Sequence, residues 1–282
     1  MKTRLFAIIL LVNALALIPA KMNAQQTRYK LIDLGTFGGQ ASYFQNGFDG
    51  ILNPNGAAVG GADTPAPDPD PAFCFNFDCF VSHAFQWRDG KLTDLGTLAP
   101  GWSSAAFWTS NTGLAVGISQ NGMIDPLFGF GEFRAALWEN GKIIDLGTLG
   151  GGYESLANAV NNRGQVVGLA TNTIADPFSY FGVTQAKAFL WERGVMRDLG
   201  TLGGPDSSAI AINDAGQIAG QSYTNSTPTP VLDSCGNFAA NVPTQDPFVW
   251  KNGKMADLGT LGGTCGSVTG QNARGQIIGQ SD

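Results

Sequence analysis

The sequence AFLWERGVMRDLGTLGG, from Ala188 to Gly204, and the SSAIAINDAGQIAGQS that follows it, from Ser207 to Ser222, decide the fold of this chain. The tetrapeptide DLGT within it occurs five times, at intervals of 51 to 61 residues. Self-similarity at such a period is typical of repeat proteins, in which each unit buries its apolar face against a neighbouring unit. The five copies begin at Asp33, Asp94, Asp145, Asp198 and Asp257.

Each unit contains four short strand candidates joined by turn sequences. The first two flank Arg193-Gly194 in the unit quoted above, and three other units have Asp-Gly or Asn-Gly there, which is the strongest short hairpin signal. The last two flank Asn213–Gly216, where Asn at the first and Gly at the last position suit a type I turn. The equivalent turns are Asp89-Gly90, Asn140-Gly141 and Asn252-Gly253, and then Asn53–Gly56, Ser110–Gly113, Asn161–Gly164 and Asn272–Gly275.

These links predict an all-β fold in which each unit is a four-stranded antiparallel meander. Four strands per repeat is the blade of a β-propeller, so we predict a β-propeller-like array of about five repeats. The repeats begin near residues 29, 83, 134, 187 and 246. A β-solenoid or an open sandwich remains the alternative. The composition, with 39 Gly, 43% hydrophobic and only 13% charged residues, is typical of many turns joining buried strands.

The motifs DLGTLGG and AINDAGQIAG, together with the Ala-Phe-x-Trp strands, resemble the HAF family of probable extracellular bacterial repeats. That name comes from His-Ala-Phe, which stands here at residues 83–85. The resemblance covers essentially everything after the leader and implies a repeat pattern and export, with no established reaction or catalytic residue. Three strands depart from the name, because Arg134, Lys187 and Asp246 occupy the position of the histidine.

The N-terminus has the layout of a secretory signal peptide. Two basic residues precede the apolar stretch Leu5–Ala20, and small residues follow. Cleavage after Ala24 makes residues 1–24 the signal peptide and 25–282 the HAF-type repeat domain. A membrane anchor is the alternative, but a polar residue and a proline interrupt a stretch that is already short for a span.

The charge of the mature chain restricts its partners. Removing the leader takes away three basic residues and no acid, which leaves 13 basic against 22 acidic residues and a net charge of −9. Such a chain repels a polyanion, so nucleic acid is excluded as a partner. We expect a secreted or extracellular protein without a membrane span after cleavage, with the periplasm and the cell surface as alternatives.

Four cysteines in an exported chain predict two disulfides. Cys74 and Cys79 lie in one segment and are expected to close a small loop. Cys235 and Cys265 are expected to pair because the meander brings their loops to the same end of the sheets. Free thiols are the alternative.

A binding site is expected in the segments that vary between units, because a residue repeated in every unit supports the fold and a single site has to break the symmetry. The DLGT aspartates are therefore expected to accept backbone N–H bonds beside their Gly-Thr turn. The variable segments are the connectors at residues 63–82, 120–133, 171–186 and 223–245, which should crowd one face. The predicted ligand-binding residues on that face are Asp70, Phe73, Trp102, Asp125, Phe128, Asp176 and Phe178.

Each connector contains or abuts an Asp-Pro pair followed closely by Phe, with the aspartates at Asp70, Asp125, Asp176 and Asp246. One interpretation is a ring of carboxylates that coordinates Ca²⁺ or binds sugar hydroxyls beside aromatic faces. The interpretation that we favour is turn initiation, with the Phe anchoring the loop. A single histidine, His83, excludes a multi-His zinc site within the chain. We therefore expect no metal and no cofactor, with calcium as the open alternative.

These patterns predict a secreted or cell-surface repeat protein that acts as a binding or structural module. Its ligand would lie on the connector face and would be a glycan or another surface protein. The alternative is an extracellular carbohydrate-active enzyme with paired carboxylates on a propeller scaffold. A repetitive stalk without a specific ligand is a third class. No residue is assigned a catalytic role.

The two ends of the sequence bear on ring closure. Only Tyr29–Ile32 precedes the first DLGT, without the Ala-Phe-x-Trp strand found before the other four, and the chain stops at Asp282 after a GQIIGQS strand. The units are thus one strand short of five complete blades. Either the two termini share one blade, or, as we prefer, the chain is a truncated copy of something longer.

Overall fold

The structure is a computed structural model that describes residues 29–44, 49–229 and 242–282. The predicted signal peptide, residues 1–24, lies outside the described residues. Among the described residues, no helix is long and apolar enough to cross a membrane.

The chain divides into two compact units, Met1–Asp33 and Leu34–Asp282. Of the first unit the structure describes only residues 29–33, which form no strand although we expected one there. The sheets described below all belong to the second unit.

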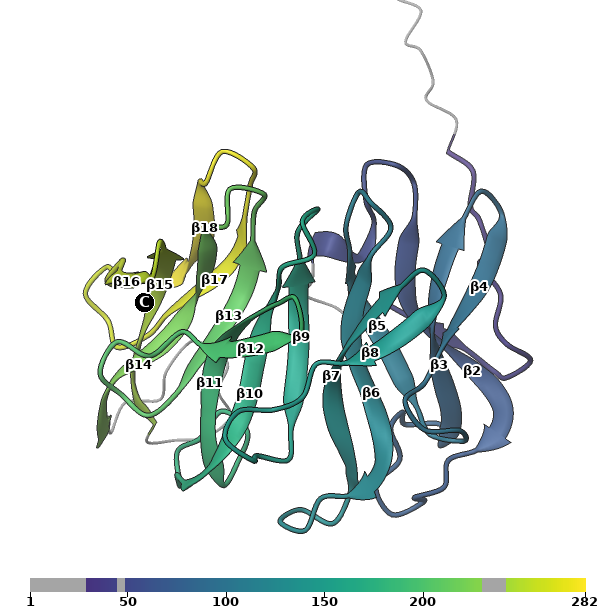
Figure 1. Cartoon of the computed structure of the whole chain (residues 1–282), viewed down its shortest axis with the longest axis horizontal. Coiled ribbons are helices and arrows are strands. Elements are labelled where there is room, and N and C mark those ends of the chain that lie inside the picture. Colours follow the sequence, from purple (N-terminus) through teal and green to yellow (C-terminus); the bar gives the residue numbers. More distant parts are fainter. Residues whose placement is uncertain (1–28, 45–48, 230–241) are drawn as a thin grey trace, which may run out of the picture. The chain divides into compact units, whose positions relative to one another are not determined.

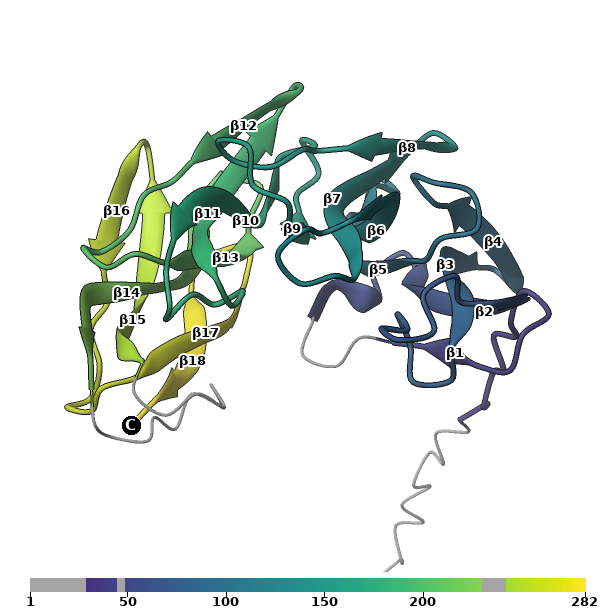
Figure 2. The ribbon, with the colours of Figure 1, turned by 90° about the horizontal axis from the view of Figure 1, so that it is seen from below.

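The second unit consists of antiparallel sheets in which consecutive strands pair (Figures 1 and 2). Strands β1–β4, β5–β8, β9–β12 and β13–β16 form four-stranded meanders, and β17 pairs with β18. The only helix in the described residues is the 3₁₀ turn η1 (Asp49–Ile51), so the prediction of an all-β fold is confirmed. The strands are β1 (Ser42–Tyr43), β2 (Ala58–Pro67), β3 (Phe80–Arg88), β4 (Lys91–Gly96), β5 (Ser104–Thr109), β6 (Ala115–Ile124), β7 (Gly131–Glu139), β8 (Lys142–Asp145), β9 (Ser155–Val160), β10 (Val166–Ala175), β11 (Thr184–Glu192), β12 (Val195–Asp198), β13 (Ser207–Ile212), β14 (Ile218–Pro228), β15 (Pro243–Lys251), β16 (Lys254–Asp257), β17 (Gly266–Gln271) and β18 (Ile277–Ser281).

The sheets do not begin at the same strand as the sequence repeats, which corrects one expectation. We expected a repeat that begins with an Ala-Phe-x-Trp strand to form one sheet. Instead that strand is the third of its sheet, as β3, β7, β11 and β15, and the sheet ends with the DLGT strand. The connectors therefore lie within sheets, between hydrogen-bonded second and third strands. The boundary falls at the loop that begins with DLGT, where Gly96, Gly147 and Gly200 have positive φ.

The hairpin between the third and fourth strands has the predicted turn in all four complete sheets. The residues before the turn glycines, Asp89, Asn140, Arg193 and Asn252, have φ between 51° and 53°, and the glycines that follow also have positive φ. Positive φ at both central residues defines the type I′ turn, whose twist matches that of paired strands. The identity of these dipeptides was therefore sufficient to place the hairpins.

A repeated serine joins each sheet to the next. Ser104 Oγ, at the start of β5, accepts a hydrogen bond from the backbone N–H of Ala84 at 2.8 Å and donates one to the carbonyl of Gly96 at 2.9 Å, both in the preceding sheet. Ser155 and Ser207 make the equivalent pair of bonds in the next two sheets. All three serines are fully buried, so these bonds fix the spacing of neighbouring sheets.

The hydrophobic core lies between neighbouring sheets. One cluster combines Leu137 of the second sheet with Val166 and Phe189 of the third, and another combines Val167 of the third with Phe248 of the fourth. The first strands β5, β9, β13 and β17 also contact one another in succession. Among the described residues, no strand pairing joins the last sheet to the first. The chain is thus a succession of packed sheets, as expected for repeats that bury their faces against neighbours.

Candidate binding sites at the two ends of the sheets

The loops between the second and third strands of the first three sheets form one surface, here called the connector rim and defined as residues 68–79, 125–130 and 176–183. Aromatic rings join these loops. The ring centroids of Phe73 and Phe130 lie 6.4 Å apart, those of Phe128 and Phe130 stack at 5.0 Å, and those of Phe128 and Phe181 lie 6.5 Å apart. Three connectors therefore share a face, as expected. Most of the fourth connector lies outside the described residues.

Two of the predicted aspartates hold their own loops. Asp125 Oδ1 accepts the backbone N–H groups of Leu127 at 2.6 Å and Phe128 at 3.2 Å, and Asp176 Oδ1 accepts that of Phe178 at 3.0 Å. Both side chains are buried. These contacts support the turn interpretation, because a carboxylate that satisfies buried backbone donors is turned away from a ligand in solvent.

In the first connector this role belongs to Asp68 and not to Asp70. The N–H of Asp68 bonds to the carbonyl of Cys79 across the loop, as that of Asp125 bonds to Phe130. The buried Asp68 carboxylate accepts the N–H of Asp70 at 2.9 Å, and Asp70 itself is half-buried. Two Asp-Pro pairs stand in succession here, so the sequence pattern alone did not distinguish them.

The predicted aromatic residues occupy different environments on the rim. Trp102 packs against the hairpin of the second sheet, where a Cβ atom added to Gly131 would lie 2.5 Å from its ring. Phe178 and Phe128 are half-buried, whereas Phe73 is 52% exposed. Trp102 therefore lies beside the rim, mainly as a packing residue.

The rim and the strand ends beside it carry seven large apolar side chains that are exposed. Isolated exposed hydrophobic residues are normal on proteins, but a contiguous group marks a surface that interacts with something. The large exposed apolar residues here are Phe73, Phe77, Met123, Ile124, Leu127, Ile174 and Val183.

Beneath the rim, carboxyl groups from neighbouring sheets are paired. Glu154, next to β9, is buried and accepts the N–H of Phe133 at 2.7 Å. Burial, and then a hydrogen bond with Asp125, raise the pKa of Glu154 to about 9. Asp206 occupies the same position one sheet further, where burial, with a smaller contribution from the charge of Asp176, raises its pKa to about 7. Glu154 is therefore protonated at neutral pH, which removes the repulsion between its carboxyl group and that of Asp125.

One predicted disulfide is present in the first connector. Cys74 and Cys79 are bonded, with a Cα–Cα distance of 5.0 Å. Cys265 is fully buried and is also disulfide-bonded, whereas Cys235 lies outside the described residues. Disulfides persist in oxidising environments, so this bond favours a location outside the cytoplasm.

The repeated DLGT aspartates and the single histidine make local contacts. The DLGT aspartates Asp94, Asp145, Asp198 and Asp257 each accept the N–H of the glycine two residues on, at 2.7 to 2.8 Å, as expected. The imidazole of His83 bonds to Asp94 at 2.8 Å. In the described part of the chain, no three His, Cys, Asp or Glu side chains are grouped so as to hold a metal ion.

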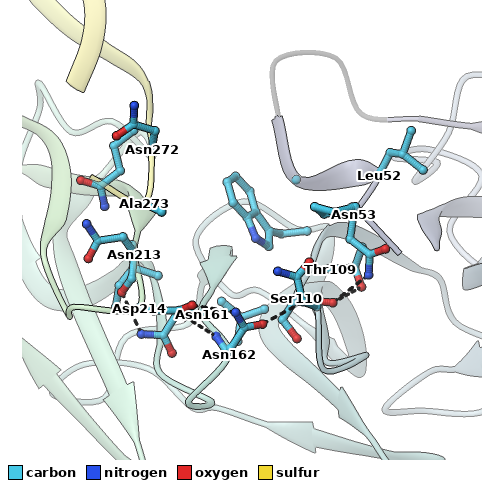
Figure 3. A pocket seen from close by; sticks show the side chains of 17 residues that line it. Leu52, Asn53, Thr109, Ser110, Asn161, Asn162, Asn213, Asp214, Asn272 and Ala273 are labelled. Atoms are coloured by element: carbon cyan, nitrogen blue, oxygen red, sulfur yellow. Dashed lines mark hydrogen bonds between the residues drawn. The ribbon is translucent and has the colours of Figure 1, made fainter. Parts of the chain in front are cut away.

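At the opposite end of the sheets, the Asn-x-x-Gly turns surround a cavity of about 240 Å³, here called the turn-end cavity (Figure 3). Residues from all five sheets or their preceding loops contribute to it. Its lining residues are Gly50, Leu52, Asn53, Pro54, Trp108, Thr109, Ser110, Asn111, Val160, Asn161, Asn162, Ile212, Asn213, Asp214, Gln271, Asn272 and Ala273.

Hydrogen bonds connect these turns from one sheet to the next. Asn161 Oδ1 accepts two N–H groups of its own turn, and Asn161 Nδ2 donates to the carbonyl of Asn213 at 3.0 Å. Asn53 makes the equivalent bond to Ser110 at 2.8 Å. Asn162 donates to Asp214, also across the sheet boundary, and Figure 3 shows the bonds between sheets around the cavity. The first asparagine of the turn therefore links sheets as well as closing a turn.

Sequence analysis missed this cavity because it treated every Asn-x-x-Gly segment as a turn alone. A signal was present. Trp108 stands where the aligned first strands have Ala159, Ala211 and Gly270, since each of these residues pairs with the second strand just after the same register shift. A single large aromatic residue at a position of small residues is the kind of break in symmetry that we looked for only in the connectors.

Comparison of the chain with protein-family models, with curated proteins and with solved structures found no match.

Proposed function

We propose that this chain is an extracytoplasmic repeat protein with β-propeller-like blades, and that its connector rim binds another protein. The proposal includes the assignment of the repeats to the HAF type and the removal of residues 1–24. The rim is the observation that carries it. Rings from three connectors form a continuous group, and exposed apolar side chains stand in the same loops and at the strand ends beside them.

A protein partner fits this surface better than a glycan does. Carboxylates that bind sugar hydroxyls have to face solvent, whereas Asp125 and Asp176 are buried and bonded within their loops. The side chains that remain exposed, such as Phe73 and Leu127, offer apolar area and few hydrogen-bonding groups. Aromatic and aliphatic side chains of this kind form the centre of protein–protein interfaces.

The alternative of a carbohydrate-active enzyme has less support. Its paired carboxylates would have to face a pocket that admits a sugar chain. The pairs found here, Asp125 with Glu154 and Asp176 with Asp206, lie between packed sheets with every member buried. Their environment suits a role in holding the sheets together.

Binding of the purified protein, residues 25–282, to cells of the source organism tests the proposal. We expect saturable binding that Phe73→Ser and Leu127→Ser weaken at least tenfold. Val195→Ser is the matched control, since Val195 is 50% exposed and Leu127 48%, but Val195 lies in the outer strand β12. Thermal unfolding would verify that all variants remain folded.

Treatment of the cells identifies the partner class. Prior protease treatment should abolish binding, and periodate oxidation of surface glycans should leave it intact. Loss of binding after periodate alone would replace the protein partner with a glycan. Equal binding by Leu127→Ser, Phe73→Ser and Val195→Ser would overturn the assignment of the rim.

A further inference from the structure

We infer that the turn-end cavity is a second binding site, which takes one sugar unit of a neutral carbohydrate. Trp108 provides the stacking face and the side-chain amides of Asn213 and Asn111 provide the hydrogen bonds. This site is independent of the connector rim, from which the full length of the sheets separates it.

Trp108 is the residue that makes this cavity differ from a symmetric channel. At the equivalent positions of β9, β13 and β17 the side chain is a methyl group or a hydrogen atom. One part of the indole packs closely on Gly50, where a Cβ atom would lie 1.9 Å from the ring. The side chain also packs against two core clusters, but it remains partly exposed and belongs to the cavity lining. The exposed part of an aromatic ring in a cavity is a platform for the apolar face of a sugar.

The asparagines around the cavity are not equivalent in their hydrogen bonding. Asn53 and Asn161 use both the oxygen and the nitrogen of their side chains. Asn213 Oδ1 accepts the N–H groups of Ala215 and Gln217, but within the described residues its Nδ2 has no protein partner. The residue is only 7% exposed, so this donor is held in a recess.

Asn111 adds a second amide at the cavity. Its backbone N–H bonds to Asn162 and its carbonyl accepts a bond from Asn55, whereas its side chain has no partner in the described part of the protein. An amide side chain has two donors and an acceptor, which match the donor and acceptor character of a sugar hydroxyl. The Asn111 amide and the Nδ2 donor of Asn213, beside an aromatic side chain, are therefore suited to an uncharged polyhydroxylated ring.

Size and charge restrict the ligand further. About 240 Å³ is below the range of cavities that hold drug-sized molecules, so the site accommodates a single ring. The described lining residues include no lysine or arginine, and Asp214, the one acid among them, already accepts two bonds from Asn162. These residues offer no cation to recognise a phosphate or an acidic sugar, which makes the neutral class the one that they fit.

The test is calorimetric titration of residues 25–282 with glucose, galactose, mannose and N-acetylglucosamine, accompanied by saturation-transfer NMR. We expect at least one of these sugars to bind saturably in the millimolar range and to receive transfer on ring protons. Asn213→Asp should raise its Kd at least tenfold. That variant keeps the oxygen that closes the turn and replaces only the unpartnered NH₂ group.

Two further variants keep the result interpretable. Asn111→Ala removes an exposed side chain without disturbing a backbone bond and should also weaken binding. Asn252→Asp makes the same change as Asn213→Asp in a hairpin turn outside the cavity and should bind as the unaltered protein does. Phe73→Ser, on the rim, should also leave sugar binding unchanged, so that failure of one proposal is distinguishable from failure of the other. Absence of binding by all four sugars at 100 mM, or equal Kd values for Asn213→Asp and Asn252→Asp, would overturn the inference.

Discussion

The two ends of the sheets are built on opposite principles. At the turn end, five four-residue turns, all ending in Gly and four of them beginning with Asn, are joined one to the next by side-chain amides. At the connector rim, loops of different length and sequence meet through aromatic rings, and buried aspartates hold each loop separately. The turn end is therefore held together by hydrogen bonds between sheets, whereas the rim is held together by turns within each loop and by apolar contacts between loops.

The difference shows how a repeat protein acquires individual sites. A residue that recurs in every unit is needed for the architecture, as the buried serines Ser104, Ser155 and Ser207 illustrate. A site arises where one unit departs from the others. At the rim the units differ from one another in their loops, and at the turn end one unit differs from the others through a single residue, Trp108. The second kind of departure is less conspicuous in the sequence but lies next to a cavity.

The largest expected effect is on the pH dependence of stability, because the buried carboxyl pairs of the described residues lie beneath the rim. The folded pKa of Glu154, about 9, lies far above its ordinary 4.5. The contribution of Glu154 protonation to the stability of the folded state is therefore complete below pH 4.5 and is lost as the pH rises to about 9. We expect the free energy of unfolding, measured in urea across this interval, to fall by several kcal/mol, with Asp206 contributing in the lower part.

Glu154→Gln isolates that effect, since the amide keeps an oxygen for Phe133 and a donor for Asp125. The variant should show a flatter pH profile above pH 7 than the unaltered protein. Glu139→Gln, at an exposed position, is the control and should leave the profile as it was. Parallel profiles for the unaltered protein and Glu154→Gln would contradict the assignment of a protonated pair.

The next effect tests whether the turn end depends on bonds between sheets. Asn161→Ala removes a buried side chain that accepts two N–H groups and donates to Asn213 in the next sheet. We expect a loss of about 3 kcal/mol in the free energy of unfolding. Asn272→Ala removes the same turn contacts at an exposed position in the last described turn and should cost about 1 kcal/mol. Equal losses would show that the turn itself, and not the bond between sheets, is what matters.

The smallest effect tests the aromatic contacts of the rim. Phe128 stacks on Phe130 and contacts Phe181 of the next sheet, so Phe128→Ala should lower the free energy of unfolding by about 2 kcal/mol. Phe77→Ala, at a fully exposed position, should change it by less than about 0.5 kcal/mol. Chemical denaturation of both variants would provide the comparison. A Phe128→Ala variant as stable as Phe77→Ala would mean that the rings are adjacent without stabilising the rim.

Much of the local structure followed from short sequence patterns. The Asp-Gly, Asn-Gly and Arg-Gly hairpins were predicted correctly because the type I′ turn requires positive φ only at its two central residues, which are adjacent in the sequence. The Cys74–Cys79 bond was predicted because only four residues separate its ends. Which strand begins each sheet was not predicted, because a repeat of four strands with four connections can be divided into sheets at any one of those connections. Only hydrogen bonding shows that the division falls at the DLGTLGG loop.

The sequence by itself determined that the chain is all-β, that it repeats, where its tight turns lie and that its connectors differ from one another. These properties depend on residues close together in the chain, where sequence order and spatial order coincide. Only the tertiary structure decided that Asp68 is the counterpart of Asp125, that Glu154 faces Asp125 and that Trp108 lines a cavity with asparagines of other sheets. Those relations join residues from different strands and sheets, and they depend on which groups packing brings together and which it removes from water.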